Sequence, residues 1–143
     1  LSFAAYAIIC LALGKTELAA FCGTIMGALL AFLWFNIPPA RFFMGDTGSM
    51  ALGLTLGVIA FLTNTVLVLP IITLVFGIEG LSFIIQYISK KTRGGKKIFL
   101  SSPIHHHFEA IGWPEYKITM RFWVIGTVSA TAGLVVALIG RGF

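Results

Sequence analysis

The sequence predicts an all-α protein, a polytopic transmembrane helix bundle. Of its 143 residues, 58% are hydrophobic and 10% are charged, whereas a soluble domain is usually about 45–50% apolar and roughly 25% charged. The apolar residues lie in long runs that short polar segments separate. Because a backbone in lipid must satisfy its own hydrogen bonds, each run that crosses the membrane should be a helix.

Five apolar runs give the order of the elements: residues 1–13, 18–35, 51–62, 66–88 and 118–139. The first run is shorter than the about 20 residues that a transmembrane helix needs, and it lacks the basic segment and cleavage site of a signal peptide. We therefore expect one truncated N-terminal span followed by four complete spans. Together they form a single integral-membrane domain, residues 1–143, which is the C-terminal part of a larger protein. Pro114 and Glu115 are start signals for the last helix.

The basic residues predict which side of the membrane each loop faces. Five of them follow the run 66–88: Lys90, Lys91, Arg93, Lys96 and Lys97. Cytoplasmic loops carry an excess of Lys and Arg, so the loop 89–117 is predicted to be cytoplasmic. Counting spans backwards makes the loop 36–49 cytoplasmic as well. The short turns 14–17 and 63–65 and the C-terminus are then on the outer side. The net charge of +5 thus indicates contact with membrane lipids rather than nucleic acid.

Asp46, in the loop 36–49, is the only aspartate of the chain. A carboxylate at a membrane edge is costly and often functional, although Asp is also a good N-cap for the helix that follows. Gly45 and Gly48 beside it allow a ligand to approach the backbone closely. One carboxylate suits Mg²⁺, which fills its remaining coordination positions with water and substrate phosphates.

Three consecutive histidines, His105, His106 and His107, lie in the loop 89–117. On a helix, adjacent side chains point about 100° apart, so the three cannot share a face, whereas His105 and Glu109 can. No HExxH pattern or other zinc spacing is present. A phosphate contact, a proton-transfer role, a transition-metal site and a solvated cluster all remain open on the residues alone.

Polar residues inside the run 66–88 and aromatic residues near Asp46 are further candidates. Glu79 and Gln86 are seven residues apart and therefore share a helix face. Gln86 is near the predicted cytoplasmic end and within reach of a ligand, whereas the deeper Glu79 is expected to make a polar contact between helices. Phe42 and Phe43 either stack on a base or pack against neighbours.

Two motifs resemble a known family. "LWFNIPPARFFMGDTGSMALG" and "SPIHHHFEAIGWPE…RFW" are similar to the C-terminal half of the bacterial phospho-N-acetylmuramoyl-pentapeptide transferases, within the polyprenyl-phosphate N-acetylhexosamine-1-phosphate transferase superfamily. The resemblance implies an enzyme of the bacterial inner membrane. Such an enzyme transfers phospho-MurNAc-pentapeptide from UDP-MurNAc-pentapeptide to undecaprenyl phosphate and forms lipid I and UMP, with Mg²⁺. A homodimer is compatible with the sequence.

The resemblance also assigns roles to residues. Asp46 matches the family's aspartate at the magnesium and pyrophosphate site. His105 and His106 are the other catalytic candidates. The substrate-binding candidates are Asn36, Phe43, Gln86 and His107, with Phe43 near the uracil.

The chain departs from the family in one respect. Family members also carry two adjacent aspartates and a nearby lysine in their first half, and this sequence has no such segment. We therefore expect the isolated chain to be inactive. Two alternatives stay open: a related polyprenyl-phosphate sugar-1-phosphate transferase that uses another UDP-sugar, and a non-catalytic membrane module that responds to metal or pH.

Overall fold

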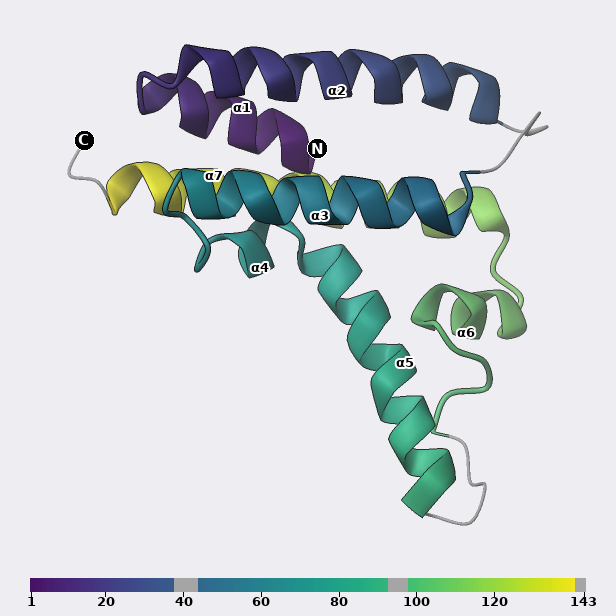
Figure 1. Cartoon of the computed structure of the whole chain (residues 1–143). Coiled ribbons are helices and arrows are strands. Elements are labelled where there is room, and N and C mark those ends of the chain that lie inside the picture. The colour runs from purple at the N-terminus through teal and green to yellow at the C-terminus, as the bar shows by residue number, and fades with distance from the viewer. Residues whose placement is uncertain (38–43, 93–97, 141–143) are drawn as a thin grey trace. The chain divides into compact units, whose positions relative to one another are not determined.

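The computed structural model describes residues 1–37, 44–92 and 98–140, which form seven α-helices (Figure 1). The helices are α1 (Ser2–Ala12), α2 (Thr16–Asn36), α3 (Asp46–Leu62), α4 (Leu69–Ile72), α5 (Leu74–Thr92), α6 (Ile104–Ala110) and α7 (Glu115–Ile139). The described ranges contain no strand, so the all-α prediction is confirmed. The chain divides into two compact units, Leu1–Ile72 with Ala130–Phe143, and Thr73–Ser129. We call them the first and the second unit.

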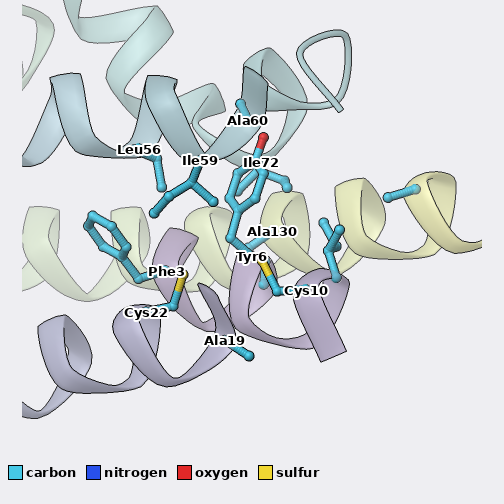
Figure 2. Packing of buried hydrophobic residues seen from close by; sticks show 13 residues of the cluster. Phe3, Tyr6, Cys10, Ala19, Cys22, Leu56, Ile59, Ala60, Ile72 and Ala130 are labelled. Atoms are coloured by element: carbon cyan, nitrogen blue, oxygen red, sulfur yellow. The ribbon is translucent and has the colours of Figure 1, made fainter. Parts of the chain in front are cut away.

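The first unit is built on α1, which packs against α2 and α3. Figure 2 shows its apolar core, in which Tyr6, Cys10 and Cys22 have no exposed surface. Neither cysteine forms a disulfide within the described residues, and both pack as small hydrophobic side chains. The rest of the buried cluster consists of Phe3, Ala5, Ile9, Ala19, Leu56, Ile59, Ala60, Ile72, Ala130 and Ala137. Small side chains in this set allow helix backbones to approach closely.

Two short turns of the first unit lie at the same end of its helices. The Lys15 ammonium donates a hydrogen bond to the carbonyl of Leu62, the last residue of α3. In the second turn, the hydroxyls of Thr63 and Thr65 are 2.7 Å apart, and the Tyr6 hydroxyl donates to the Thr65 carbonyl at 3.4 Å. The side of the membrane predicted for these two turns stays a prediction.

The predicted continuous helix over residues 66–88 is wrong, because the structure divides this run into α4 and α5 at Thr73. Pro70, which lacks a backbone N–H, is the second residue of α4. A helix that began at residue 66 would place Pro70 in its interior, where it removes a hydrogen bond and clashes with the preceding turn. The break is also the boundary between the two units.

α4 packs closely against the C-terminal part of α7 within the first unit. A Cβ atom added at Gly133 would lie 2.5 Å from Cγ1 and 3.2 Å from the backbone nitrogen of Ile72. Only a glycine leaves room for this approach. Gly133 therefore has a packing role that its position in an apolar run did not reveal.

Two of the described helices, α2 with 21 residues and α7 with 25, are long and apolar enough to cross a bilayer. α1 and α3 are apolar but shorter. The apolar helices support a membrane location, and the count of four complete spans stays a prediction. α7 begins at Glu115, and the carbonyl of Pro114 accepts the N–H groups of Lys117 and Ile118. The predicted start of the last helix is thus confirmed.

Candidate functional site

A row of polar side chains on α5 organises the second unit. Glu79, Ser82 and Gln86 follow one another at spacings of three and four residues and therefore share one face of the helix. Ser82 and Gln86 are each 3% exposed, and the side chain of Glu79 is 19% exposed. We call these three residues the polar row. Each of them contacts a different point of the segment that leads into and forms α6.

Gln86 holds the residues that precede α6. Its side-chain oxygen accepts the N–H groups of Ile98 and Phe99 at 3.0 and 3.1 Å. Its side-chain nitrogen donates to the carbonyl of Phe99 at 2.9 Å. The sequence predicted that Gln86 contacts substrate, but its oxygen and one of its two N–H groups are already used. Its ligand-binding role stays a prediction, and the structure gives it a positioning role that the sequence did not indicate.

Ser82 attaches the first residue of α6 to α5. Its hydroxyl donates to the Glu79 carbonyl at 2.7 Å and accepts the N–H of Ile104 at 3.0 Å. The first N–H groups of a helix have no partner within that helix, so Ser82 satisfies one of them from a neighbouring helix. Ser82 was not among the predicted site residues, because a lone serine in an apolar run carries no distinctive spacing.

His105 contacts the third member of the polar row. Its Nδ1 atom lies 2.8 Å from Oε2 of Glu79, and the histidine side chain is 37% exposed. The polar interhelix contact predicted for Glu79 is therefore confirmed. The other carboxylate oxygen, Oε1, is buried and has no hydrogen-bond partner among the described residues.

The other two histidines point to different partners. Nδ1 of His106 lies 2.7 Å from Oε2 of Glu109 within α6. Nδ1 of His107 accepts the N–H of Leu100 at 3.1 Å. His107 thus supports the segment before α6, and its predicted role in substrate binding stays a prediction. The three directions agree with the divergence expected of consecutive helical residues.

A hollow of ≈ 290 Å³ adjoins two of these groups in the second unit. It is lined by His105, Glu109, Glu115, Ile118, Thr119, Phe122 and Trp123. Two carboxylates and one imidazole therefore line it together with aromatic and aliphatic side chains. Such a lining attracts a cation or accepts a proton more readily than it holds a bare phosphate.

An aromatic group supports the turn between α6 and α7. The rings of Phe108 and Trp113 stack with centroids 5.1 Å apart. The guanidinium of Arg121 and the ammonium of Lys117 lie 4.3 and 4.8 Å from the Trp113 ring centroid. Cations at such distances are attracted by the negative face of the ring. This group fixes the start of α7, which contributes most of the lining of the hollow.

Asp46 and Asn36 belong to the first unit. Asp46 is the first residue of α3, and its side chain is exposed. The described residues give its carboxylate no hydrogen-bond partner, so it does not act as an N-cap there. Asn36 ends α2, and its Oδ1 atom is buried without a partner in the described part of the chain. Phe43 lies outside the described residues. The prediction that the loops with these residues and the histidines face the same side of the membrane stays a prediction.

Residues 1–37, 44–92 and 98–140 contain no group of three or more His, Cys, Asp or Glu side chains that could hold a metal ion. A single exposed carboxylate such as that of Asp46 still fits Mg²⁺, which takes one or two protein carboxylates and completes its shell with water and phosphate oxygens. The magnesium-binding role predicted for Asp46 stays a prediction.

Comparison with known proteins shows which sequences this chain is similar to. Residues 1–64 match the sequence model of glycosyl transferase family 4. A phospho-N-acetylmuramoyl-pentapeptide-transferase of Francisella philomiragia is 50% identical over 122 residues, which are 85% of this chain and 33% of that protein. A relative of the same name from a Geobacillus species is 48% identical over 134 residues, 94% of this chain and 41% of that protein. One from Granulibacter bethesdensis is 51% identical over 121 residues, 85% of this chain and 33% of that protein.

The chain spans between 33% and 41% of the length of these three curated relatives. The resemblance predicted from the two motifs is confirmed, since most of the chain is similar to transferases of this name. The roles predicted for individual residues stay predictions.

Proposed function

We propose that this chain contributes to a phospho-N-acetylmuramoyl-pentapeptide transferase of the bacterial cytoplasmic membrane. The enzyme would transfer phospho-MurNAc-pentapeptide from UDP-MurNAc-pentapeptide to undecaprenyl phosphate, forming lipid I and UMP for peptidoglycan synthesis. The observation that carries this proposal is the identity of about 50% with relatives of that name over 85–94% of the chain. The apolar helices support the membrane location that a polyprenyl substrate requires.

Asp46 is the proposed magnesium ligand. Its carboxylate is exposed at the first turn of α3 and takes no part in capping that helix. When bound, Mg²⁺ would supply positive charge that neutralises the pyrophosphate as UMP leaves. Asp46 itself contributes one negatively charged oxygen ligand, and the helix N-terminus behind it carries partial positive charge that suits a phosphate.

His105 and His106 are the proposed proton-transfer residues. Each uses Nδ1 to contact a carboxylate, so Nε2 is the nitrogen left for a substrate. Glu109 and Glu115 line the same hollow as His105, and carboxylates there repel a phosphate that approaches this imidazole. A proton-transfer role therefore fits this environment better than a role as a phosphate anchor.

A chimera tests the proposal without assuming anything about the ends of this chain. The residues aligned with the Geobacillus relative would replace the matching 134-residue segment of that enzyme. The measurement is Mg²⁺-dependent formation of lipid I from UDP-MurNAc-pentapeptide and undecaprenyl phosphate. We expect turnover in the chimera, no turnover after chelation of Mg²⁺, and a loss of about 10²–10³-fold for Asp46→Asn, the range seen when one charge-stabilising group is removed.

Leu54→Ala, on an exposed position of the same helix, is the matched control and should keep its activity. Normal turnover of Asp46→Asn would contradict the site assignment. A chimera that prefers UDP-GlcNAc over UDP-MurNAc-pentapeptide would replace the proposal with a related sugar-1-phosphate transferase.

A further inference from the structure

We propose that Glu79 is the positioning residue for His105. It holds the proton on Nδ1, so that Nε2 is the nitrogen presented to a ligand. The geometry stands without the proposed function, whereas the catalytic consequence rests on it. The carrying observation is the 2.8 Å contact between Nδ1 of His105 and Oε2 of Glu79, made between two different helices.

The hydrogen-bond chemistry of the pair determines the tautomer of the ring. In the proposed arrangement, Oε2 of Glu79 accepts the 2.8 Å hydrogen bond and Nδ1 of His105 donates it. Which ring nitrogen is protonated is set by the bond that the other one makes. Nε2 of His105 is then an acceptor in the neutral ring and a donor in the protonated ring. In both states, Nε2 is the nitrogen available to a substrate.

Helix α5 contacts both the side chain of His105 and the backbone around it. The preceding residue, Ile104, is fixed by the Ser82 hydroxyl, and the segment at Ile98 and Phe99 is fixed by Gln86. All three contacts come from the polar row on α5. Glu79 thus acts on a side chain whose backbone is already fixed to α5, which is what a defined ring orientation requires.

The second carboxylate oxygen of Glu79, Oε1, is buried and has no hydrogen-bond partner among the described residues. A carboxylate in an apolar helix is costly unless it is paired. The contact between Oε2 and Nδ1 of His105 is the pairing that offsets this cost.

The pair formed by His106 and Glu109 provides a natural comparison. Both residues belong to α6, three positions apart, and their side chains are 49% and 35% exposed. This pair cannot orient α6 against α5, because it lies within α6.

The other charged or titratable groups near His105 are His106, whose ring centroid is 4.1 Å away, and Glu109 and Glu115, which line the hollow.

The tautomer of His105 can be measured directly on the full chain in lipid nanodiscs. Long-range proton–nitrogen spectra of ¹⁵N-histidine-labelled protein distinguish a protonated Nδ1 from a protonated Nε2, and His105→Asn assigns the signals. In the unsubstituted chain we expect His105 to carry its proton on Nδ1. In Glu79→Leu we expect the proton to move to Nε2 or to be shared between the nitrogens.

Matched variants separate positioning from folding. Glu79→Gln keeps the length of the side chain and an acceptor oxygen, so it should shift the tautomer less than Glu79→Leu. Glu109→Leu should change the signals of His106 and leave those of His105 as they were. An Nε2-protonated His105 in the unsubstituted chain would overturn the proposal, and so would an Nδ1-protonated His105 in a folded Glu79→Leu variant.

The chimera described above adds a kinetic measurement. Glu79→Leu should lower kcat by about 10–100-fold, as removal of an outer partner of a functional histidine does, with KM for the UDP substrate unchanged. A change in KM with normal kcat would contradict a role in orienting His105. Because the spectra require no turnover, failure of the chimera would count against the proposed function and leave the spectroscopic test intact.

Discussion

Different interactions stabilise the interiors of the two units of this protein. The first unit packs apolar and small side chains, and its most buried members are Tyr6, Cys10, Cys22 and Ala60. The second unit has few fully buried apolar residues and is organised by the polar row on α5, whose hydrogen bonds run to three points of a single segment. Close packing of side chains holds helices together, whereas hydrogen bonds also fix the orientation of the groups that they join.

The difference matters most in a membrane. Lipid tails are as apolar as leucine, so burial of apolar surface gives little drive for helices to associate, and close packing and hydrogen bonds take its place. The first unit uses close packing. The second unit, which carries the histidines, uses hydrogen bonds. These bonds fix the positions of the histidine ring nitrogens, which packing of apolar side chains alone would not do.

The largest expected structural effect is that of Gln86→Leu, which removes three hydrogen bonds at once. The N–H groups of Ile98 and Phe99 and the carbonyl of Phe99 would lose their partner. A hydrogen bond contributes about 0.5–1.5 kcal/mol to stability, so loss of three should make local opening of this segment about 2–4 kcal/mol easier. Hydrogen exchange of the amides of residues 98–104 in nanodiscs measures it.

Tyr87→Leu is the matched control for Gln86→Leu, since Tyr87 is 61% exposed on the same helix. This substitution should leave the hydrogen exchange of residues 98–104 unchanged. Equal exchange rates in Gln86→Leu and the unsubstituted chain would show that the polar row does not hold this segment.

A smaller effect is expected where the first unit is packed most tightly. Gly133→Leu forces its side chain into the space of Ile72, whose Cγ1 atom lies only 2.5 Å from the position that a Cβ atom at residue 133 would take. Overpacking of this kind typically costs about 1–3 kcal/mol. We expect a lower midpoint of unfolding in a denaturant titration in detergent, with the exchange of residues 98–104 unaffected.

Gly57→Leu is the control for Gly133→Leu, because nothing lies within 4 Å of a Cβ atom at Gly57. If both substitutions lowered the midpoint equally, the loss would reflect the mere removal of a glycine and not the contact with α4.

The smallest effect is expected for Ser82→Ala, which removes one hydrogen bond at the start of α6. Leaving the N–H of Ile104 without a partner should cost about 1–2 kcal/mol. Exchange should rise at Ile104 alone, with residues 98 and 99 still protected by Gln86. Thr92→Ala on the same helix is the control, since its hydroxyl bonds to the carbonyl of Ile88 within α5. Faster exchange throughout residues 98–104 would mean that Ser82 and Gln86 do not act separately.

Much of the fold was predictable because composition and helix signals are local. The apolar runs predicted helices, and Pro114 with Glu115 predicted the start of α7. The break at Thr73 could not be predicted from hydropathy, because the run 66–88 is apolar almost without interruption and is long enough for one span. Pro70 inside that run was the signal that a single helix would not fit.

The candidate site was predictable only in part. The seven-residue spacing of Glu79 and Gln86 correctly predicted a shared face, and the contact expected of Glu79 was found. Their partners could not be predicted, because the backbone of residues 98–100 has no periodicity that relates it to α5. His105 and Glu109, expected to be able to share a helix face, line the same hollow, whereas the contact of Glu109 with His106 was not predicted.

The order of contacts along the polar row has a consequence for the length of the chain. Reading α5 backwards, Gln86 bonds residues 98 and 99, Ser82 bonds residue 104, and Glu79 bonds residue 105. Gln86 and Ser82 are about 6 Å apart along the helix axis, and the segment from Phe99 to Ile104 must join these two points. Five residue steps reach up to about 17 Å when extended, so this connection is not taut over the distance that it covers. An insertion within residues 100–103 can therefore bulge outward while the contacts of Gln86, Ser82 and Glu79 are kept, and these contacts, rather than the length of the connection, determine where His105 lies along α5.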